Sequence, residues 1–305
     1  MLVAIDQARL VLEQRAAALG FPPERAALLA DHLLDAELCG ASSHGAERMR
    51  WLAGFSGLQP EARAQLELRE PGLARYTSAG ALGYLALADA IDAELAEPTT
   101  RARTVVVTGC FPSGRLGYFA ERVARRGRVC LLCASSPARL SHPAGGGPIL
   151  GTNPFCLALP DEPEPFVIDV SMGRITYGDV LEAAAAGEPL PPDTAIGPDG
   201  APEADPAGVI AAVSGILPFG GEQAYKGFAL ALMVGLLAGA LGNADNATAV
   251  LVMAEPQADP LPEMRERAAG LRLPGEASAA RRRQALERGS IELPDGLWEW
   301  LTDSM

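Results

Sequence analysis

The chain has 305 residues, of which 49% are hydrophobic and 21% charged, and its formal net charge is −13. This composition is that of a globular protein with a large core in one or two domains, and it excludes a disordered or fibrous chain. The acidic balance argues against a nucleic-acid-binding surface. No secretory signal and no apolar run of membrane length are found, so we expect a cytoplasmic protein that does not interact with membranes.

The first 60 residues are expected to form three helices. Apolar residues recur at helical spacing over residues 10–19, and Pro23 suits the start of a second helix over residues 26–38. A third helix would begin at Ser42 or Ser43 and end near Gly57. A charged transition follows over residues 60–72, and residues 80–95 are again typical of a helix.

The start of the third helix carries a candidate catalytic pair. A hydroxyl N-cap at Ser42 or Ser43 would place His44 in the first turn, with Arg48 four residues later on the same face. A proton-transfer group beside a fixed cation is what a small anionic substrate needs. The helix N-terminus would disfavour an imidazolium, and a bound carboxylate would favour it. The alternative is an ordinary histidine behind a helix cap.

The middle of the chain predicts an α/β unit. Residues 104–107 and 129–134 are apolar, β-branched-rich runs with an amphipathic helix over 115–126 between them, which favours parallel strands joined by a crossover. A long Pro/Gly-rich segment over 135–153 indicates a functional loop. Later strands are expected at 155–159, 166–170 and 249–253, and helices at 173–186, 222–241, 260–269, 277–288 and 295–301. The helix at 222–241 is apolar on all sides and is predicted to be buried.

Two familiar signatures fail. The glycine-rich loop from Gly109 to Gly117 lacks the Lys and Ser/Thr of a phosphate-binding loop, and its spacing does not match the dinucleotide fingerprint. Cys130 and Cys133 form a C-x-x-C motif inside an apolar run, which favours core packing over redox chemistry. We therefore expect no disulfide framework and no metal site.

Three further positions have a functional and a structural interpretation. Lys226, the only lysine, opens an apolar helix and suits a phosphate, ribose or carboxylate contact, or else is a surface lysine. Asp169 ends a buried strand, where it would accept hydrogen bonds from a ligand or cap the next helix. The Gly-Thr-Asn-Pro segment from Gly151 supplies polar groups in a tight loop, or is only a turn.

Taken in order, these motifs resemble the malate/L-lactate dehydrogenase family of NAD(P)-dependent oxidoreductases, which includes ureidoglycolate and sulfolactate dehydrogenases and cyclic 2-imino acid reductases. The matching segments are SSHGAER, PAGGGPILGTNP, FVIDVS, GILPFGGEQAYKGFALAL, LPGE and RGSIEL. The resemblance implies an α/β fold with a non-Rossmann NAD(P)-binding sheet flanked by helices, in a homodimer with the site near the subunit interface. It implies an N-terminal helical segment (1–75), a cofactor-binding core (76–255) and C-terminal helices (256–305), the last joining the first in one lobe.

The resemblance also assigns roles to residues. His44 and Lys226 would be catalytic, and Arg48 would hold the carboxylate of a small anionic substrate. Ser43 and Ser136 are further expected substrate contacts. His142 is added to them from its position in the Pro/Gly-rich loop and not from the resemblance. NADPH or NADH would contact Thr152, Asn153, Asp169, Val170, Ser171, Lys226, Gly275 and Glu276.

One departure from the family pattern shapes the functional prediction. Pro112 stands where the family has a second histidine, which acts as acid/base in part of the family. His44 alone, a mobile His142, or an imine substrate protonated before hydride transfer would each compensate. The prediction is an NAD(P)H-dependent reductase of a small 2-imino or 2-oxo acid. The alternative is a catalytically degenerate member that binds a nucleotide or a partner, or reuses the pocket.

Overall fold

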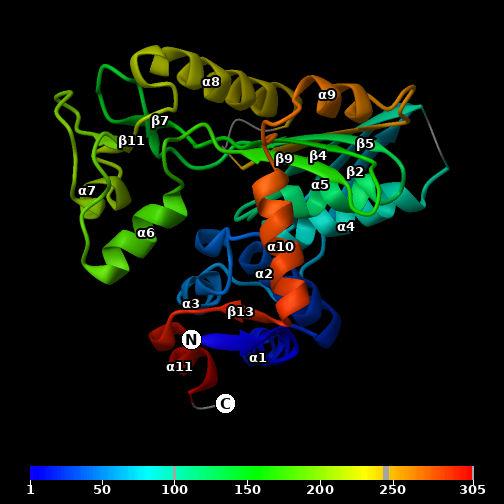
Figure 1. The fold of residues 1–305 in the computed structure, drawn as a ribbon, viewed down its shortest axis with the longest axis horizontal. Helices are drawn as coiled ribbons and strands as arrows, with labels where there is room; N and C mark the ends of the chain where they lie inside the picture. The colour runs from blue at the N-terminus through cyan, green and yellow to red at the C-terminus, as the bar shows by residue number, and fades with distance from the viewer. Residues whose placement is uncertain (99–100, 243–246, 304–305) are drawn as a thin grey trace.

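A twisted sheet of seven strands among the described residues lies between two layers of helices, seen edge-on in Figure 1. The computed structural model describes residues 1–98, 101–242 and 247–303. In spatial order the strands are β2 (Gln65–Glu70), β3 (Leu73–Thr77), β4 (Ala102–Thr108), β12 (Ala249–Ala254), β5 (Val129–Ala134), β8 (Phe155–Leu159) and β9 (Phe166–Val170). The mixed α/β class expected from the sequence is confirmed.

Strands β4 and β5 run in the same direction, as the sequence predicts, but they are not neighbours in the sheet. Strand β12 lies between them and pairs antiparallel with both, and the one parallel pair in this described sheet is β3 with β4. The hairpin of β2 and β3 was missed, because β2 is an exposed edge strand with the burial pattern of a polar surface. Leu66 and Leu68 alternate with polar residues in β2, but two apolar positions in a highly charged segment are too few to identify a strand by periodicity.

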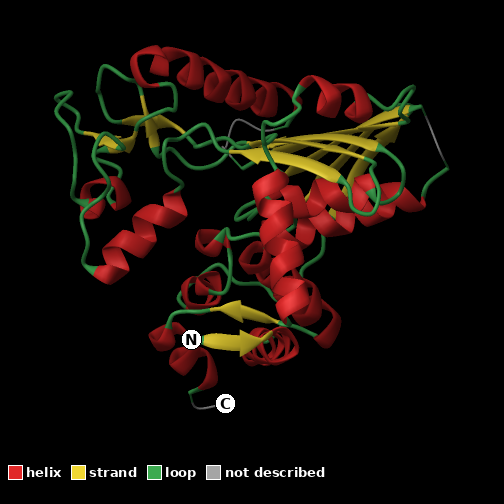
Figure 2. Ribbon diagram, in the orientation of Figure 1, coloured by secondary structure: helices red, strands yellow, loops and turns green. Residues whose placement is uncertain are grey.

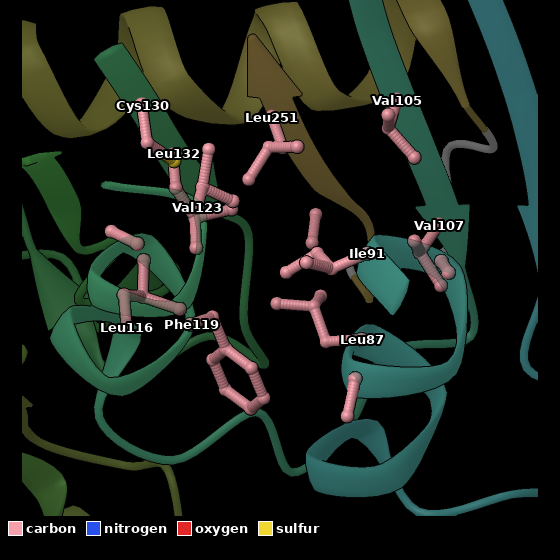
Figure 3. Close-up of a cluster of buried hydrophobic side chains, with 14 of the residues drawn as sticks. Leu87, Ile91, Val105, Val107, Leu116, Phe119, Val123, Cys130, Leu132 and Leu251 are labelled. Carbon is pink, nitrogen blue, oxygen red and sulfur yellow. The ribbon is translucent and has the colours of Figure 1, made fainter. Parts of the chain in front are cut away.

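Helices cover both faces of the sheet (Figures 1 and 2). Helices α4 (Gly83–Ala96) and α5 (Leu116–Ala124) lie on one face, and α8 (Ala224–Leu241) and α9 (Leu261–Arg267) lie on the other. Figure 3 shows the core on the first side, where Leu87 and Ile91 of α4 and Phe119 of α5 meet Leu132 and Leu251 of the strands. Burial of these aliphatic and aromatic side chains is the main stabilising contribution of this layer.

A second lobe joins the two ends of the chain. Strand β1 (Leu2–Ala4) pairs antiparallel with β13 (Ser290–Glu292), so that the N-terminus lies beside the C-terminal helices (Figure 1). Its helices are α1 (Ile5–Ala18), α2 (Pro23–Leu38), the 3₁₀ turn η1 (Ser42–His44), α3 (Glu47–Ala53), α10 (Glu276–Arg288) and α11 (Asp295–Thr302). These elements share one apolar cluster that is separate from the sheet core.

A smaller lobe begins with the long loop after β5. Its sheet has the order β10 (Ala195–Ile196), β11 (Gly215–Ile216), β6 (Leu140–Ser141) and β7 (Pro148–Leu150), accompanied by α6 (Tyr177–Ala186), α7 (Pro206–Ile210) and the turn η2 (Gly221–Gln223). Helix α6 begins four residues later than expected, because Thr176 and Asp179 form a capping box there. Packing against Ala231 and Val234 of α8 fixes this lobe to the sheet.

The prediction that α8 is a buried helix is wrong. The segment Gly221–Leu241 has a mean hydropathy of 1.7 and the length of a membrane span, but only 28% of it is buried. Small residues such as Gly227, Ala231 and Ala238 face the protein, whereas Met233 and Leu236 are 63% and 64% exposed. A helix that is apolar on all sides has no polar face to mark the side exposed to solvent, so the sequence did not show which residues of α8 are buried.

Candidate active site

A cavity of about 1080 Å³ lies between the three lobes. Its walls come from η1 and α3, from the loop before α5, from the start of α6, from β9 and from α10. Ser43, His44, Arg48, Ser136, Thr152, Asp169, Ser171, Gly275 and Glu276 all line it, so nine of the residues singled out from the sequence converge here. Pro112 lines the same cavity.

The local structure around His44 differs from the expected helix. Ser42–His44 form a single 3₁₀ turn without a side-chain cap, Gly45 breaks the chain direction, and α3 starts only at Glu47. Gly45 is required because a Cβ there would lie 2.1 Å from Oε1 of Glu37 on α2. His44 and Arg48 are nevertheless brought together, since the Arg48 Nε donates to the Ser43 carbonyl at 2.7 Å.

A short chain of hydrogen bonds orients the imidazole. The Ser43 Oγ lies 3.2 Å from Nδ1 of His44 and also 3.2 Å from Oγ1 of Thr176, the cap of α6. Nδ1 is therefore held by the protein, which leaves Nε2 to meet a ligand. Because Arg48 uses Nε to bind the Ser43 carbonyl, its two terminal nitrogens remain for an anion.

His44 is neutral in the free protein. Its pKa is lowered to about 4. Burial is the largest cause, the nearby Arg48 guanidinium is the second, and Asp179 partly opposes both. Glu37, which accepts a 2.7 Å hydrogen bond from the Ala46 amide behind this turn, has its pKa raised by burial to about 7. A bound anion would offset the Arg48 charge and so favour protonation of the imidazole.

The arginines around the cavity fall into two groups. Arg115, Arg265, Arg282 and Arg283 each form an ion pair with a carboxylate, whereas Arg48, Arg139 and Arg272 have no carboxylate partner among the described residues. The second group is unusual in a chain with 38 acidic and 25 basic residues. Cations left without partners in a cleft indicate an anionic ligand.

Asp169 and Gly275 shape the far end of the cavity. Asp169 accepts from the Gly117 amide at 2.7 Å, in the first turn of α5, and burial raises its pKa despite that bond and the nearby Arg115. The suggestion that Asp169 caps the helix after Ser171 is wrong, because Thr176 does so. A Cβ at Gly275 would lie 1.9 Å from the Val167 carbonyl, so the α10 backbone packs directly on β9.

Four expected site residues do not reach this cavity within one chain, as far as the described residues show. The Asn153 amide is buried, accepting from the Ser136 amide and donating to the Ala231 carbonyl, so it braces the loop against α8. Val170 is 43% exposed at the end of β9. Lys226 and His142 lie on or beside α8, with Nζ 5.8 Å from the Tyr225 ring and the imidazole 4.9 Å from the Phe228 ring.

Several lining residues escaped the sequence analysis. The spacing of Thr176 and Asp179 is that of a capping box and would have located the start of α6. Arg139 and Tyr177 carry no local signal, because they meet only through the tertiary structure, with the Arg139 guanidinium 4.7 Å from the ring centroid. Arg115 was passed over as part of a failed nucleotide motif.

Comparison with known proteins agrees with this geometry. The family model for malate/L-lactate dehydrogenase matches residues 3–263. The chain is 32% identical to a (2R)-3-sulfolactate dehydrogenase (NADP(+)) of Chromohalobacter salexigens, over 79% of this chain and 72% of that protein. It is 34% identical to a Delta(1)-pyrroline-2-carboxylate/Delta(1)-piperideine-2-carboxylate reductase of Pseudomonas putida, over 71% and 64%. The structure of a dehydrogenase from Sinorhizobium meliloti superposes with a TM-score of 0.86 at 27% identity, covering 99% of this chain and 97% of that one. The chain therefore belongs to the malate/L-lactate dehydrogenase family of oxidoreductases.

Proposed function

We propose that this protein is an NAD(P)H-dependent reductase that transfers hydride to a small 2-oxo or 2-imino acid. The observation that carries the proposal is the pairing of His44 with Arg48 in one cavity, with both side chains fixed through Ser43. Arg48 presents its terminal nitrogens to a carboxylate, and His44 presents Nε2 to the adjacent reacting atom. Relatives named for small acids and for cyclic imino acids support this substrate range.

The residues present fit a nicotinamide dinucleotide. The cavity volume of about 1080 Å³ slightly exceeds the range of roughly 300–1,000 Å³ for small-molecule sites, as suits a dinucleotide together with a small acid. Thr152, Ser171 and Gly275 line it, and Arg272, which has no carboxylate partner among the described residues, suits a phosphate. When bound, the nicotinamide would supply the hydride.

Residues of the chain carry out substrate binding and proton transfer. Docking of a carboxylate on Arg48 offsets the charge that holds the His44 pKa down, so proton uptake by the imidazole accompanies binding. The protonated His44 then gives its proton to the oxygen or nitrogen of the reduced group. An imine already protonated in solution needs less of this help, which would accommodate Pro112 in place of a second histidine.

The proposal is tested by titrating NADH and NADPH into the protein by fluorescence, followed by turnover with cyclic imino acids and 2-oxo acids. Binding with turnover of at least one acid supports it. No binding of either cofactor would exclude hydride transfer.

A catalytically degenerate protein is the second candidate, and Pro112 in the cavity wall is the observation that favours it. The Pro112→His variant separates the two. If the native protein binds cofactor without turnover and the variant reduces 2-oxo acids, the native chain is degenerate. If the native protein already reduces a 2-oxo or 2-imino acid, it is not degenerate.

We also propose that the exposed face of α8 packs against a second copy of the chain in a homodimer. A contiguous apolar face of α8 is 41–64% exposed at Leu230, Met233, Leu236 and Leu237, and Leu232 and Tyr225 beside it are 38% and 56% exposed. Soluble monomers rarely leave such a surface in water. Light scattering after size exclusion is expected to give twice the mass of the chain, and Leu236→Glu should reduce it to one. A monomeric native protein would contradict this.

A further inference from the structure

We propose that the Tyr84 hydroxyl donates a hydrogen bond to the 2-oxygen of a bound 2-oxo acid and stabilises the negative charge that forms there during reduction. Tyr84 is then a further catalytic residue, and one that serves 2-oxo acids but not 2-imino acids. The chemistry rests on the proposed function, whereas the hydrogen bond itself is testable by binding alone.

Tyr84 is held in the cavity wall at the start of α4. Its amide donates to the Pro112 carbonyl at 2.9 Å, so its backbone is tied to the loop before α5. Its ring packs edge-on against the His32 ring, with the centroids 4.9 Å apart, in the apolar cluster of the lobe that joins the two chain ends. A Cβ on Gly114 would lie 2.4 Å from Cε1 of the ring. These contacts fix the ring without using the hydroxyl.

The hydroxyl of Tyr84 has no hydrogen-bond partner among the described residues. The two other buried tyrosines both donate to carboxylates. Tyr76 donates to Glu94 at 2.6 Å, and Tyr118 donates to Asp31 at 2.9 Å. A buried tyrosine hydroxyl normally has such a partner. The Tyr84 oxygen lacks one without being sealed from solvent, so it opens into the cavity that the residue lines and is available to a ligand there.

The phenol lies within electrostatic reach of the Arg48 guanidinium. Burial raises the pKa of Tyr84 and outweighs the opposing effect of the Arg48 charge, so the phenol stays protonated and remains a donor at neutral pH. Arg48 also lowers the pKa of His44, and all three residues line the cavity. The 2-oxygen of a 2-oxo acid is on the carbon next to the carboxylate. A carboxylate on Arg48 therefore brings that oxygen to both the phenol and the imidazole.

Carbonyl and imine reduction place different demands on this donor. When hydride reaches the 2-carbon of a 2-oxo acid, the electron pair of the C=O bond moves to the oxygen. The oxygen then carries a negative charge, which the phenol stabilises until His44 delivers its proton. A protonated imine has no lone pair on its nitrogen, and the electron pair of its C=N bond only neutralises that nitrogen. The Tyr84 hydroxyl therefore assists the first reaction and not the second.

The test is the Tyr84→Phe variant, assayed with pyruvate and with Delta(1)-pyrroline-2-carboxylate at a pH where the imine is protonated. For pyruvate, kcat should fall roughly 10²–10³-fold with little change in KM, because a donor to the developing charge is lost. For the imino acid, kcat should change little. The acid limb that His44 imposes on kcat/KM should not move, because the phenol does not titrate there. An equal fall in kcat for both substrates, or a rise in KM alone, would overturn the proposal.

The matched control is Tyr118→Phe. Tyr118 also packs on His32, with the ring centroids 4.7 Å apart, but it is not part of the cavity wall and its hydroxyl is bound to Asp31. Tyr118→Phe should lower the midpoint of thermal unfolding and leave kcat unchanged for both substrates. Tyr84→Phe should do the reverse, because its hydroxyl has no protein partner to lose. An equal loss of thermal stability in the two variants would assign the Tyr84 hydroxyl a structural role instead.

Calorimetric titration with oxamate and propionate separates this inference from the proposed function. Oxamate is an unreactive analogue of pyruvate that keeps an acceptor oxygen at the 2-position, and propionate has none. Tyr84→Phe should weaken oxamate binding roughly 2–10-fold and leave propionate binding unchanged, even if the protein reduces nothing. Oxamate that binds the native protein no better than propionate, or a variant that weakens both equally, refutes the hydrogen bond. Turnover of a 2-oxo acid by that same protein would leave the reductase standing.

Discussion

The protonation of His44 yields a sharp prediction. Its pKa of about 4 lies about 2.5 below the ordinary value of 6.5, which corresponds to about 3.4 kcal/mol against the imidazolium. In the oxidation of a hydroxy acid the imidazole must accept a proton. The profile of kcat/KM against pH, which reports the free protein, should therefore fall only near pH 4 and stay flat from about pH 5 to 7. In the direction of reduction, kcat/KM should drop about tenfold for each pH unit above 4.

The perturbation is Arg48→Gln. Arg48 is the second cause of the lowered pKa after burial, so its loss should move the acid limb upward, between 4 and 6.5, while KM rises. Asp179, which raises the pKa of His44, and Arg115, which lowers it, remain in place. His44→Asn should abolish the limb and reduce kcat by roughly 10²–10⁴-fold.

The assay is stopped-flow turnover after a jump from pH 7, which limits acid unfolding. Arg267→Gln serves as the charge-matched control and should leave the limb where it is. A native acid limb near pH 6.5, or a His44→Asn variant with native rates, would refute the reasoning.

Three further outcomes are expected. Because the fold raises the pKa of Glu37 from 4.5 to about 7, its contribution to stability is fully present below pH 4.5 and is lost as pH rises through 7. In urea unfolding, the gain in unfolding free energy of Glu37→Gln over the native protein should grow from near zero at pH 4.5 to at most about 3 kcal/mol above pH 7, and a gain independent of pH would contradict this. Asn153→Ala should cost roughly 2–4 kcal/mol by the same measurement, because two backbone partners in the interior lose their hydrogen bonds, and a loss below 0.5 kcal/mol would argue against that brace. Gly275→Ala should weaken NAD(P)H binding at least tenfold, measured by fluorescence, because its Cβ would displace α10 from the Val167 carbonyl at a φ of +93°; an unchanged affinity would show that this contact is not part of the cofactor end.

The sequence by itself determined much of this molecule. Apolar runs located β4, β5, β8, β9 and β12, and periodic segments located α4, α9, α10 and α11, because burial of a strand or a helix face leaves a local pattern. The length of its apolar run located α8, but not the face of α8 that packs against the protein. The sequence also predicted that His44 and Arg48 lie together, although it placed both on one helix, whereas His44 lies in a 3₁₀ turn before α3. Gly45 breaks that helix because Glu37 of α2 occupies the space, and no local rule contains that contact.

Tertiary structure decided which face of α8 stays in water and which arginines are free. In the sequence Arg115, Arg139 and Arg282 look alike, since a guanidinium is charged in every context. Only the fold brings Asp35 and Glu121 to two of them and an aromatic ring to the third. The partners of a charge come from segments distant in the chain, so the electrostatic character of the site was fixed when the lobes packed together.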